Sequence, residues 1–190
     1  MTMLVARRCF TVVEYHKMAE AGILGEDDRV ELIEGEIVQM SPIGRGHLAC
    51  VDRLNDLLVR GLGDQVIVRV QGSIRLNGGS EPEPDLVLLR RRPDFYASAD
   101  AGPEDVLLVI EVADSSLAYD YGVKVPLYAR AGISELWLVD LRDGSMSVFR
   151  EPAGKGYRSV AVVRGDDRVS PHAFPELVLT LGQILGAPHA

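Results

Sequence analysis

The spacing of apolar residues predicts several helices. Residues 11–21 place their apolar side chains on one side of a helix, and Thr11 can cap its start. Residues 47–62 repeat apolar side chains every three or four positions and end at glycines. Residues 117–131 are also helical in pattern, but Pro126 lacks the backbone N–H that a continuous helix needs. We therefore expect a kink or a late helix start at Pro126.

Alternating and continuous apolar runs predict the first strands. Residues 29–40 alternate around a turn at Glu34-Gly35, which is typical of a β-hairpin. Residues 65–76 favour one bent strand or two short ones. Residues 84–89 and 106–113 are apolar runs rich in β-branched side chains, as in central strands covered on both faces. We expect these last two strands to be neighbours in the core.

The C-terminal part continues the same alternation of elements. Residues 135–141 predict another central strand, residues 146–150 and 157–163 an antiparallel meander, and residues 179–185 a short helix. Crossover helices in the middle and antiparallel hairpins at both ends indicate a mixed α/β sandwich. The chain has no GxGxxG, GxxxxGK[ST] or GxSxG motif, which disfavours nucleotide-binding folds and serine hydrolases. We find no linker, so one domain over residues 1–190 is expected.

The composition is that of an ordinary globular protein. The chain has 190 residues, of which 47% are hydrophobic and 25% charged. Its longest apolar run, residues 106–110, is far shorter than the about 20 residues that cross a bilayer. An apolar signal-peptide core is also missing, so we expect a cytoplasmic protein that does not bind membranes. Cys9 and Cys50 lack CxxC spacing, which argues against disulfides and zinc.

The net charge of −8 argues against tight nonspecific binding to DNA, because such binding depends on many Lys and Arg contacts to phosphates. Local basic groups could still contact a nucleic acid. Arg90, Arg91 and Arg92 are adjacent, and Arg53 and Arg60 fall roughly on one helix face. Most charge runs are simply solvated surface.

The most informative residue is Glu111, which interrupts the apolar run LLVIEVA. A carboxylate inside a core strand is costly unless it is paired, hydrogen-bonded or bound to a metal. Asp85 begins the neighbouring predicted strand, and Lys124 lies on the helix that follows. Two acids at the ends of adjacent strands can hold Mg²⁺ against a phosphate, and a nearby lysine can orient the attacking hydroxide.

Structural explanations of the same residues remain open. Asp85 follows a proline and could be an ordinary strand-start acid. Glu111 and Lys124 could form a buried ion pair without catalytic purpose. Asp120, Lys124 and Tyr128 have the i, i+4, i+8 spacing of a surface pair on one helix face.

Two further polar residues have simple interpretations. His47 opens a predicted helix, and we interpret it as a solvated or capping residue, because no second histidine stands at ligand-pair spacing. Glu31 belongs to the predicted hairpin and could lie on its surface. Neither residue is assigned to a site by its spacing.

Three stretches of the sequence resemble the Uma-two family of restriction-endonuclease-like proteins. They are FTVVEYHKMAEAGILGEDDRVELIEGEIVQMSPIG, SEPEPDLVLL and VLLVIEVADSSLAYDYGVKVPLYARAGISELWLVD. The resemblance runs from about Phe10 to Leu141, and the last stretch is the most specific. It implies the PD-(D/E)XK nuclease fold, a mixed central sheet flanked by helices, in which two acids and a lysine surround a divalent metal.

Carried onto this sequence, the first acid of the motif is Asp85 and the second is Glu111. The lysine that normally follows two residues later is replaced by Ala113, and Lys124 looks like the migrated lysine. The resemblance also implies the backbone carbonyl of Val112 as a metal ligand and, more loosely, Glu31 as a supporting acid. Asp120 and Tyr128, on the helix face of Lys124, are expected beside it as supporting residues.

We therefore expect an endonuclease that hydrolyses DNA with Mg²⁺ or Mn²⁺. DNA would bind weakly or locally, and a homodimer is expected because nucleases that cut both strands often work in pairs. One alternative is a catalytically silent binding or assembly module, which the acidic charge and the lack of an appended DNA-binding domain favour. Another is a metal-dependent hydrolase of a different phosphate substrate such as RNA. The fold does not decide between them.

Overall fold

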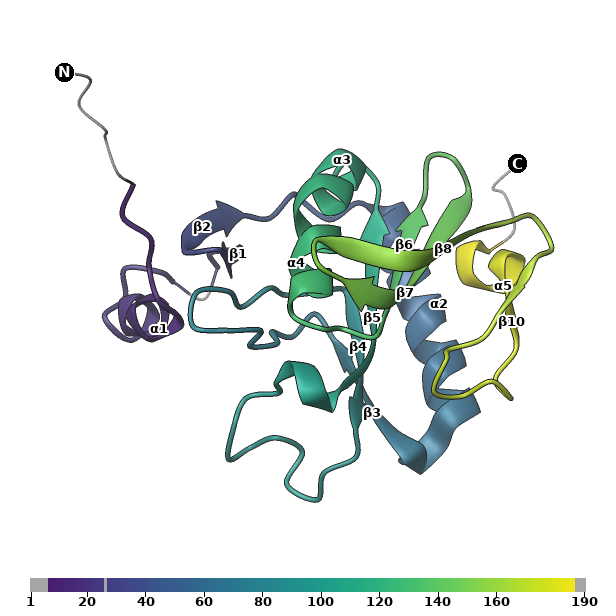
Figure 1. Cartoon of the computed structure of the whole chain (residues 1–190), viewed down its shortest axis with the longest axis horizontal. Helices are drawn as coiled ribbons and strands as arrows, with labels where there is room; N and C mark the ends of the chain where they lie inside the picture. Colours follow the sequence, from purple (N-terminus) through teal and green to yellow (C-terminus); the bar gives the residue numbers. More distant parts are fainter. Residues whose placement is uncertain (1–6, 26, 187–190) are drawn as a thin grey trace.

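A six-stranded mixed sheet, in the order β3-β4-β5-β6-β7-β8, forms the centre of the molecule (Figure 1). The computed structural model describes residues 7–25 and 27–186. Neighbouring strands are antiparallel except β5 and β6, which are parallel. The strands are β3 (Val66–Val70), β4 (Leu86–Arg90), β5 (Val106–Ala113), β6 (Glu135–Asp140), β7 (Ser145–Ala153) and β8 (Gly156–Arg164). The predicted mixed α/β class is confirmed.

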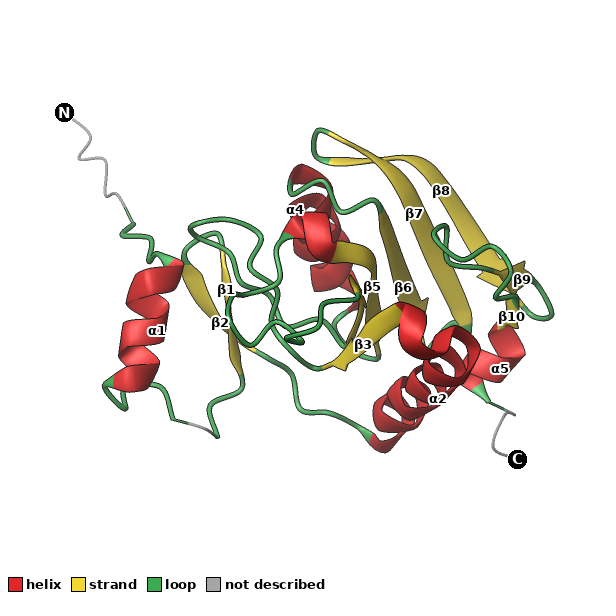
Figure 2. Cartoon of the chain, turned by 90° about the horizontal axis from the view of Figure 1, so that it is seen from below, coloured by secondary structure: helices red, strands yellow, loops and turns green. Residues whose placement is uncertain are grey.

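Helices cover both faces of this sheet (Figure 2). One face packs against α2 (Arg45–Leu62) and α5 (Leu181–Leu185), and the other against α4 (Val125–Arg130). Neighbouring residues of β4 point to opposite cores, since Leu88 contributes to the first and Val87 to the second. Strands β4 and β5 are therefore buried on both faces and adjacent, as predicted. Among the described helices, none combines the length and apolar character needed to cross a membrane.

The crossover between the parallel strands β5 and β6 is irregular at the predicted place. It runs from α3 (Leu117–Tyr119) through a π-helical turn (Asp120–Lys124) into α4. The Val125 N–H donates to the Asp120 carbonyl five residues earlier, and Pro126, which has no N–H, follows at once. Pro126 thus falls in the first turn of α4, where the backbone N–H has no intrahelical partner, so the expected irregularity is confirmed.

Small antiparallel pairs lie outside the main sheet. At the N-terminal end α1 (Val12–Glu20), capped by Thr11, precedes the hairpin of β1 (Val30–Ile33) and β2 (Glu36–Gln39). Near the C-terminus β9 (Arg168–Val169) pairs with β10 (Leu179–Thr180). Two 3-10 turns complete the elements, Gly63–Gln65 and Pro103–Asp105.

The prediction of a strand through residue 76 was wrong. Strand β3 ends at Val70, because Gln71 has a positive φ of 45° that is incompatible with a continuing strand. Ile74 is nevertheless fully buried, and the Leu76 N–H donates to the Ser80 carbonyl in a local turn. The alternating pattern here thus marks buried loop positions as well as strand residues.

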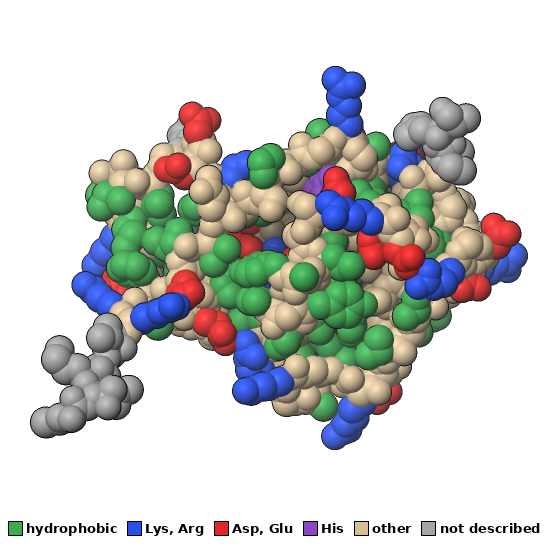
Figure 3. Space-filling view, turned by 90° about the horizontal axis from the view of Figure 1, so that it is seen from above, with side chains coloured by type: hydrophobic (Ala, Val, Ile, Leu, Met, Phe, Trp, Pro, Cys, Tyr) green, Lys and Arg blue, Asp and Glu red, His purple; other side chains and the backbone are tan. Residues whose placement is uncertain are grey.

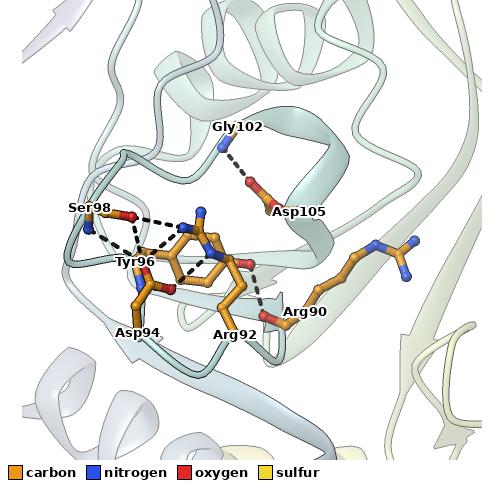
Figure 4. A network of polar contacts seen from close by, with 7 residues as sticks. All are labelled: Arg90, Arg92, Asp94, Tyr96, Ser98, Gly102 and Asp105. Atoms are coloured by element: carbon orange, nitrogen blue, oxygen red, sulfur yellow. Dashed lines mark hydrogen bonds and ion pairs between the residues drawn. The ribbon is translucent and has the colours of Figure 1, made fainter.

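The connection between β4 and β5 is held by its own polar network (Figure 4). Arg92 pairs with Asp94 at 2.8 Å, and the Ser98 hydroxyl donates to the same carboxylate at 2.6 Å. The Tyr96 hydroxyl donates to the Arg90 carbonyl at 2.8 Å. This surface segment is therefore specifically ordered, although its sequence pattern carries little signal.

Candidate active site

A cavity of about 340 Å³ opens beside the start of β4 and the end of β5. The β1–β2 hairpin, the start of α2 and the crossover helices form its other walls. A hollow with acidic side chains visible inside it appears on one face of the molecule (Figure 3). The charged and titratable residues that line the cavity are Arg29, Glu31, His47, Glu83, Asp85, Glu111, Asp114, Tyr119, Asp120 and Lys124. It is thus predominantly acidic.

Asp85 is held from two sides immediately before β4. Its Oδ2 accepts a 2.8 Å hydrogen bond from the Val112 N–H of β5, and its Oδ1 lies 3.0 Å from His47 Nε2. In the ladder between the strands Leu86 stands opposite Ile110. One step further along this register brings Asp85 opposite Glu111, on the same face of the sheet. The two predicted acids are therefore neighbours.

Glu111 is 4% exposed and accepts two hydrogen bonds on one oxygen. Its Oε1 accepts from Lys124 Nζ at 3.1 Å and from the Tyr128 hydroxyl at 2.6 Å. Burial raises the pKa of Glu111 to about 8; Lys124 opposes this rise, and three neighbouring carboxylates add to it. The carboxyl is thus placed where negative charge is already in excess.

Lys124 reaches these acids from the crossover. Parallel strands can be joined only by a connection across one face of the sheet, so the segment from β5 to β6 packs back over Glu111. Lys124 Nζ lies 3.2 Å from Glu31 Oε2 as well as 3.1 Å from Glu111. Burial disfavours the charged amine, but the surrounding carboxylates outweigh burial and raise the pKa of Lys124 above its ordinary value. The lysine points into the cluster, as predicted.

The supporting residues are also buried here. Glu31 is 3% exposed; its Oε2 accepts a hydrogen bond from the Glu83 N–H and forms an ion pair with Lys124. Asp120 is buried and accepts from the Ser116 hydroxyl at 2.6 Å; burial raises its pKa. Tyr128 is fully buried against Glu111. The surface interpretations of Glu31 and of the Asp120, Lys124 and Tyr128 face were therefore wrong, whereas the buried ion pair between Glu111 and Lys124 is present.

His47 was missed by the sequence interpretation. Its side chain is only 12% exposed, lines the cavity and contacts Asp85 instead of capping α2 or facing solvent. Its other ring nitrogen, Nδ1, is buried and makes no hydrogen bond within the described part of the chain. No local spacing could reveal this contact, because the partner carboxylate is distant in sequence.

The comparisons with known proteins agree with this geometry. The model of the Uma2 family, described as "Putative restriction endonuclease", matches residues 12–182. The chain belongs to the Uma2 family. A crystal structure of "a putative nuclease belonging to DUF820" from Anabaena variabilis superimposes with a TM-score of 0.71 at 18% identity. The similarity covers 93% of this chain and 97% of that one, which confirms the predicted nuclease fold. No curated protein matches the chain.

The donor set of this Uma2 protein suits a divalent cation. Across residues 7–25 and 27–186, no three His, Cys, Asp or Glu side chains are already arranged around one metal position. Asp85 and Glu111 nevertheless supply the oxygen ligands that Mg²⁺ prefers, and Mg²⁺ keeps several waters in protein sites. The buried acids Glu31, Glu111 and Asp120 act on the ammonium of Lys124, and Asp85 adds a further acid beside Glu111. A divalent cation would reduce this imbalance.

The basic residues noted in the sequence lie elsewhere. Strand β4 begins beside Asp85 and ends at Arg90, so the Arg90 to Arg92 run is at the opposite end of that strand from the cavity. Arg92 is paired with Asp94, Arg60 lies 2.7 Å from Asp56, and Arg53 donates to the Ile184 carbonyl. These arginines have local structural partners.

Proposed function

We propose that this protein is an endonuclease that hydrolyses phosphodiester bonds of DNA with Mg²⁺ or Mn²⁺ as its cofactor. The observation that carries the proposal is the 3.1 Å contact between Lys124 Nζ and Glu111, next to Asp85 in an acidic cavity. Membership of the Uma2 family and the nuclease fold support the reaction class. The two acids and the lysine supply the chemistry such a reaction needs.

The proposed metal ligands are Asp85, Glu111 and the backbone carbonyl of Val112. Both hydrogen bonds to Glu111 fall on Oε1, so we assign Oε2 to the metal. The Val112 N–H fixes the Asp85 carboxylate through Oδ2, and Val112 lines the cavity. A bound divalent cation lowers the pKa of a coordinated water and stabilises negative charge on the phosphate.

Lys124 is proposed to orient the attacking water. Its charged ammonium donates a hydrogen bond to Glu111 and forms an ion pair with Glu31, so an N–H donor is left for a water or hydroxide. Water oxygen forms a bond to phosphorus while the bond from phosphorus to one ester oxygen breaks, and that oxygen takes up a proton. Tyr128 keeps Glu111 in place, and the Asp120 carboxylate, bonded to Ser116, borders the same cavity.

The net charge of the chain bears on the strength of DNA binding, and the reaction class bears on the assembly. A chain of net charge −8 would bind DNA weakly, so cleavage is expected to fall with rising salt. We further propose a homodimer, in which two cavities could act on the two strands of a duplex. Light scattering on the intact protein measures this assembly directly.

The test compares the wild type with Glu111→Gln on plasmid DNA at low salt, with Mg²⁺, Mn²⁺ or EDTA. Gln keeps the side-chain shape but removes the charge, so metal-dependent cleavage should fall by orders of magnitude while the fold survives. Glu81→Gln is the matched control, because Glu81 is also a buried carboxylate but contacts His16 outside the cavity. It should retain cleavage.

A different result would reassign the protein. A wild type that cleaves neither DNA nor RNA with any of these ions, and whose melting temperature no metal raises, is a binding or assembly module with a buried ion pair. Metal-dependent cleavage of RNA but not of DNA would keep the site and change the substrate.

A further inference from the structure

We propose that His47 Nε2 is a third side-chain ligand of the metal held by Asp85 and Glu111, so that the cavity binds a divalent transition-metal ion such as Mn²⁺ in preference to Mg²⁺. The inference rests on the proposed metal-dependent function and goes beyond it, because it adds a nitrogen to an oxygen site. His47 is otherwise an unexplained member of the cavity wall.

The separation of the two side chains fits shared coordination. His47 Nε2 lies 3.0 Å from Asp85 Oδ1. Two ligand atoms that are each about 2.1 Å from a metal and at a right angle to one another are about 3.0 Å apart. A metal ion can therefore bind both atoms without large movement of either side chain. Each of the two side chains is 12% exposed.

The three proposed side chains come from separate, firmly packed elements. His47 lies in the first turn of α2, an 18-residue helix whose Leu54 and Leu58 are fully buried in the core. Asp85 and Glu111 belong to the neighbouring chain segments of the central sheet, opposite one another. A ligand on α2 thus approaches the pair of acids from outside the sheet.

A histidine near a carboxylate is not sufficient by itself. His16 Nε2 lies 2.9 and 3.1 Å from the two oxygens of Glu81, but both residues are outside the cavity and the His16 side chain is 44% exposed. His47 differs because a second carboxylate, Glu111, stands opposite its partner. Of these two histidines, His47 therefore has the surroundings of a metal ligand and His16 does not.

The nitrogen determines the preferred ion. Mg²⁺ favours oxygen ligands and holds its waters tightly, whereas first-row transition metals gain more from an imidazole nitrogen. Coordination through Nε2 uses the neutral tautomer with its proton on Nδ1. His47 adds no charge to the site, so its effect is on the choice of ion more than on the electrostatic attraction.

The test uses Mn²⁺ alone as the probe on the intact protein. Electron spin echo envelope modulation of the bound Mn²⁺ should show the ¹⁴N coupling of one coordinated imidazole. In the wild type labelled with [¹⁵N]histidine, a ¹⁵N coupling should replace the ¹⁴N coupling. This comparison requires no mutation. The coupling should vanish in His47→Gln and persist in His16→Gln, the matched control. Calorimetry should show a loss of Mn²⁺ affinity of roughly tenfold or more in His47→Gln and a lower ratio of Mn²⁺ to Mg²⁺ affinity.

The outcomes separate this inference from the proposed function. Mn²⁺ that does not bind, or that binds without histidine coupling, overturns the assignment of His47 even if the protein cleaves DNA. Histidine coupling that disappears only in His47→Gln supports the assignment even if no nucleic acid is cleaved, in which case the nuclease proposal alone fails.

Discussion

The ammonium nitrogen of Lys124 lies 3.1 Å from Glu111 Oε1, and both side chains are at least nine-tenths buried. Lys124 Nζ also lies 3.2 Å from the buried carboxylate of Glu31, so removing the ammonium leaves that charge uncompensated. We predict that Lys124→Met lowers the free energy of unfolding by roughly 3–5 kcal/mol, measured by urea titration. Lys155→Met, at an exposed position of the β7–β8 turn, should change it little. Equal stability of Lys124→Met and the wild type would refute a stabilising role for the ion pair.

The stability of the metal-free protein should depend on pH through Glu111. Its pKa is raised from 4.5 to about 8, first by burial and further by the nearby carboxylates, against the opposing effect of Lys124. Between these values the folded chain keeps a proton that the unfolded chain has released. The stabilisation that this proton gives is therefore present below pH 4.5 and is lost as the pH rises towards 8.

Urea titrations in EDTA from pH 5 to pH 8 measure this component. The free energy of unfolding of the wild type should fall relative to that of Glu111→Gln, which has no such proton to lose. Saturating Mn²⁺ should reverse the trend, because metal binding requires the deprotonated carboxylate. A difference between the two proteins that does not vary with pH would contradict the raised pKa.

The two cysteines should differ strongly in reactivity. Cys50 is fully buried, and burial raises the pKa of its thiol to about 12, with Arg53 opposing and Asp85 adding to the rise. Cys9 is exposed. Since the thiolate is the reactive form, a disulfide reagent at pH 8 should modify one thiol in the native protein and two in denaturant. Cys9→Ser should abolish the native reaction; rapid native modification of that variant would show that Cys50 is accessible.

Much of the fold could be predicted because burial follows simple periods. The apolar run of β5, interrupted only by Glu111, matches its observed bounds, Val106–Ala113, since a strand covered on both faces is apolar at nearly every position. The hairpin turn at Glu34-Gly35 was equally clear, because both residues have positive φ, at 50° and 82°. Pattern failed at Ile74, where a loop residue is buried without a strand around it.

The site was only partly predictable for a related reason. Glu111 could be recognised because a carboxylate contradicts its apolar surroundings, and Asp85 and Lys124 because each lies beside an apolar run. The resemblance to the Uma-two family then gave these residues their roles. His47 sits in an amphipathic helix where a polar residue is unremarkable, and only the packing of α2 beside β4 gives it a partner. Contacts between distant segments leave no trace in local spacing.

The π-helical turn Asp120–Lys124 also places the lysine by backbone length. A π turn contains one residue more than an α turn, and each residue of an α-helix advances the direction of the side chain by about 100°. Shortening this turn by one residue between Asp120 and Lys124 would leave Lys124 in line with Tyr128, four residues later, but would rotate both side chains relative to α3 and to Glu111. One extra backbone residue can thus direct a lysine on a helix toward an acid on a neighbouring strand. Related chains could gain or lose the site through an insertion or deletion in this crossover, without changing any of its side chains.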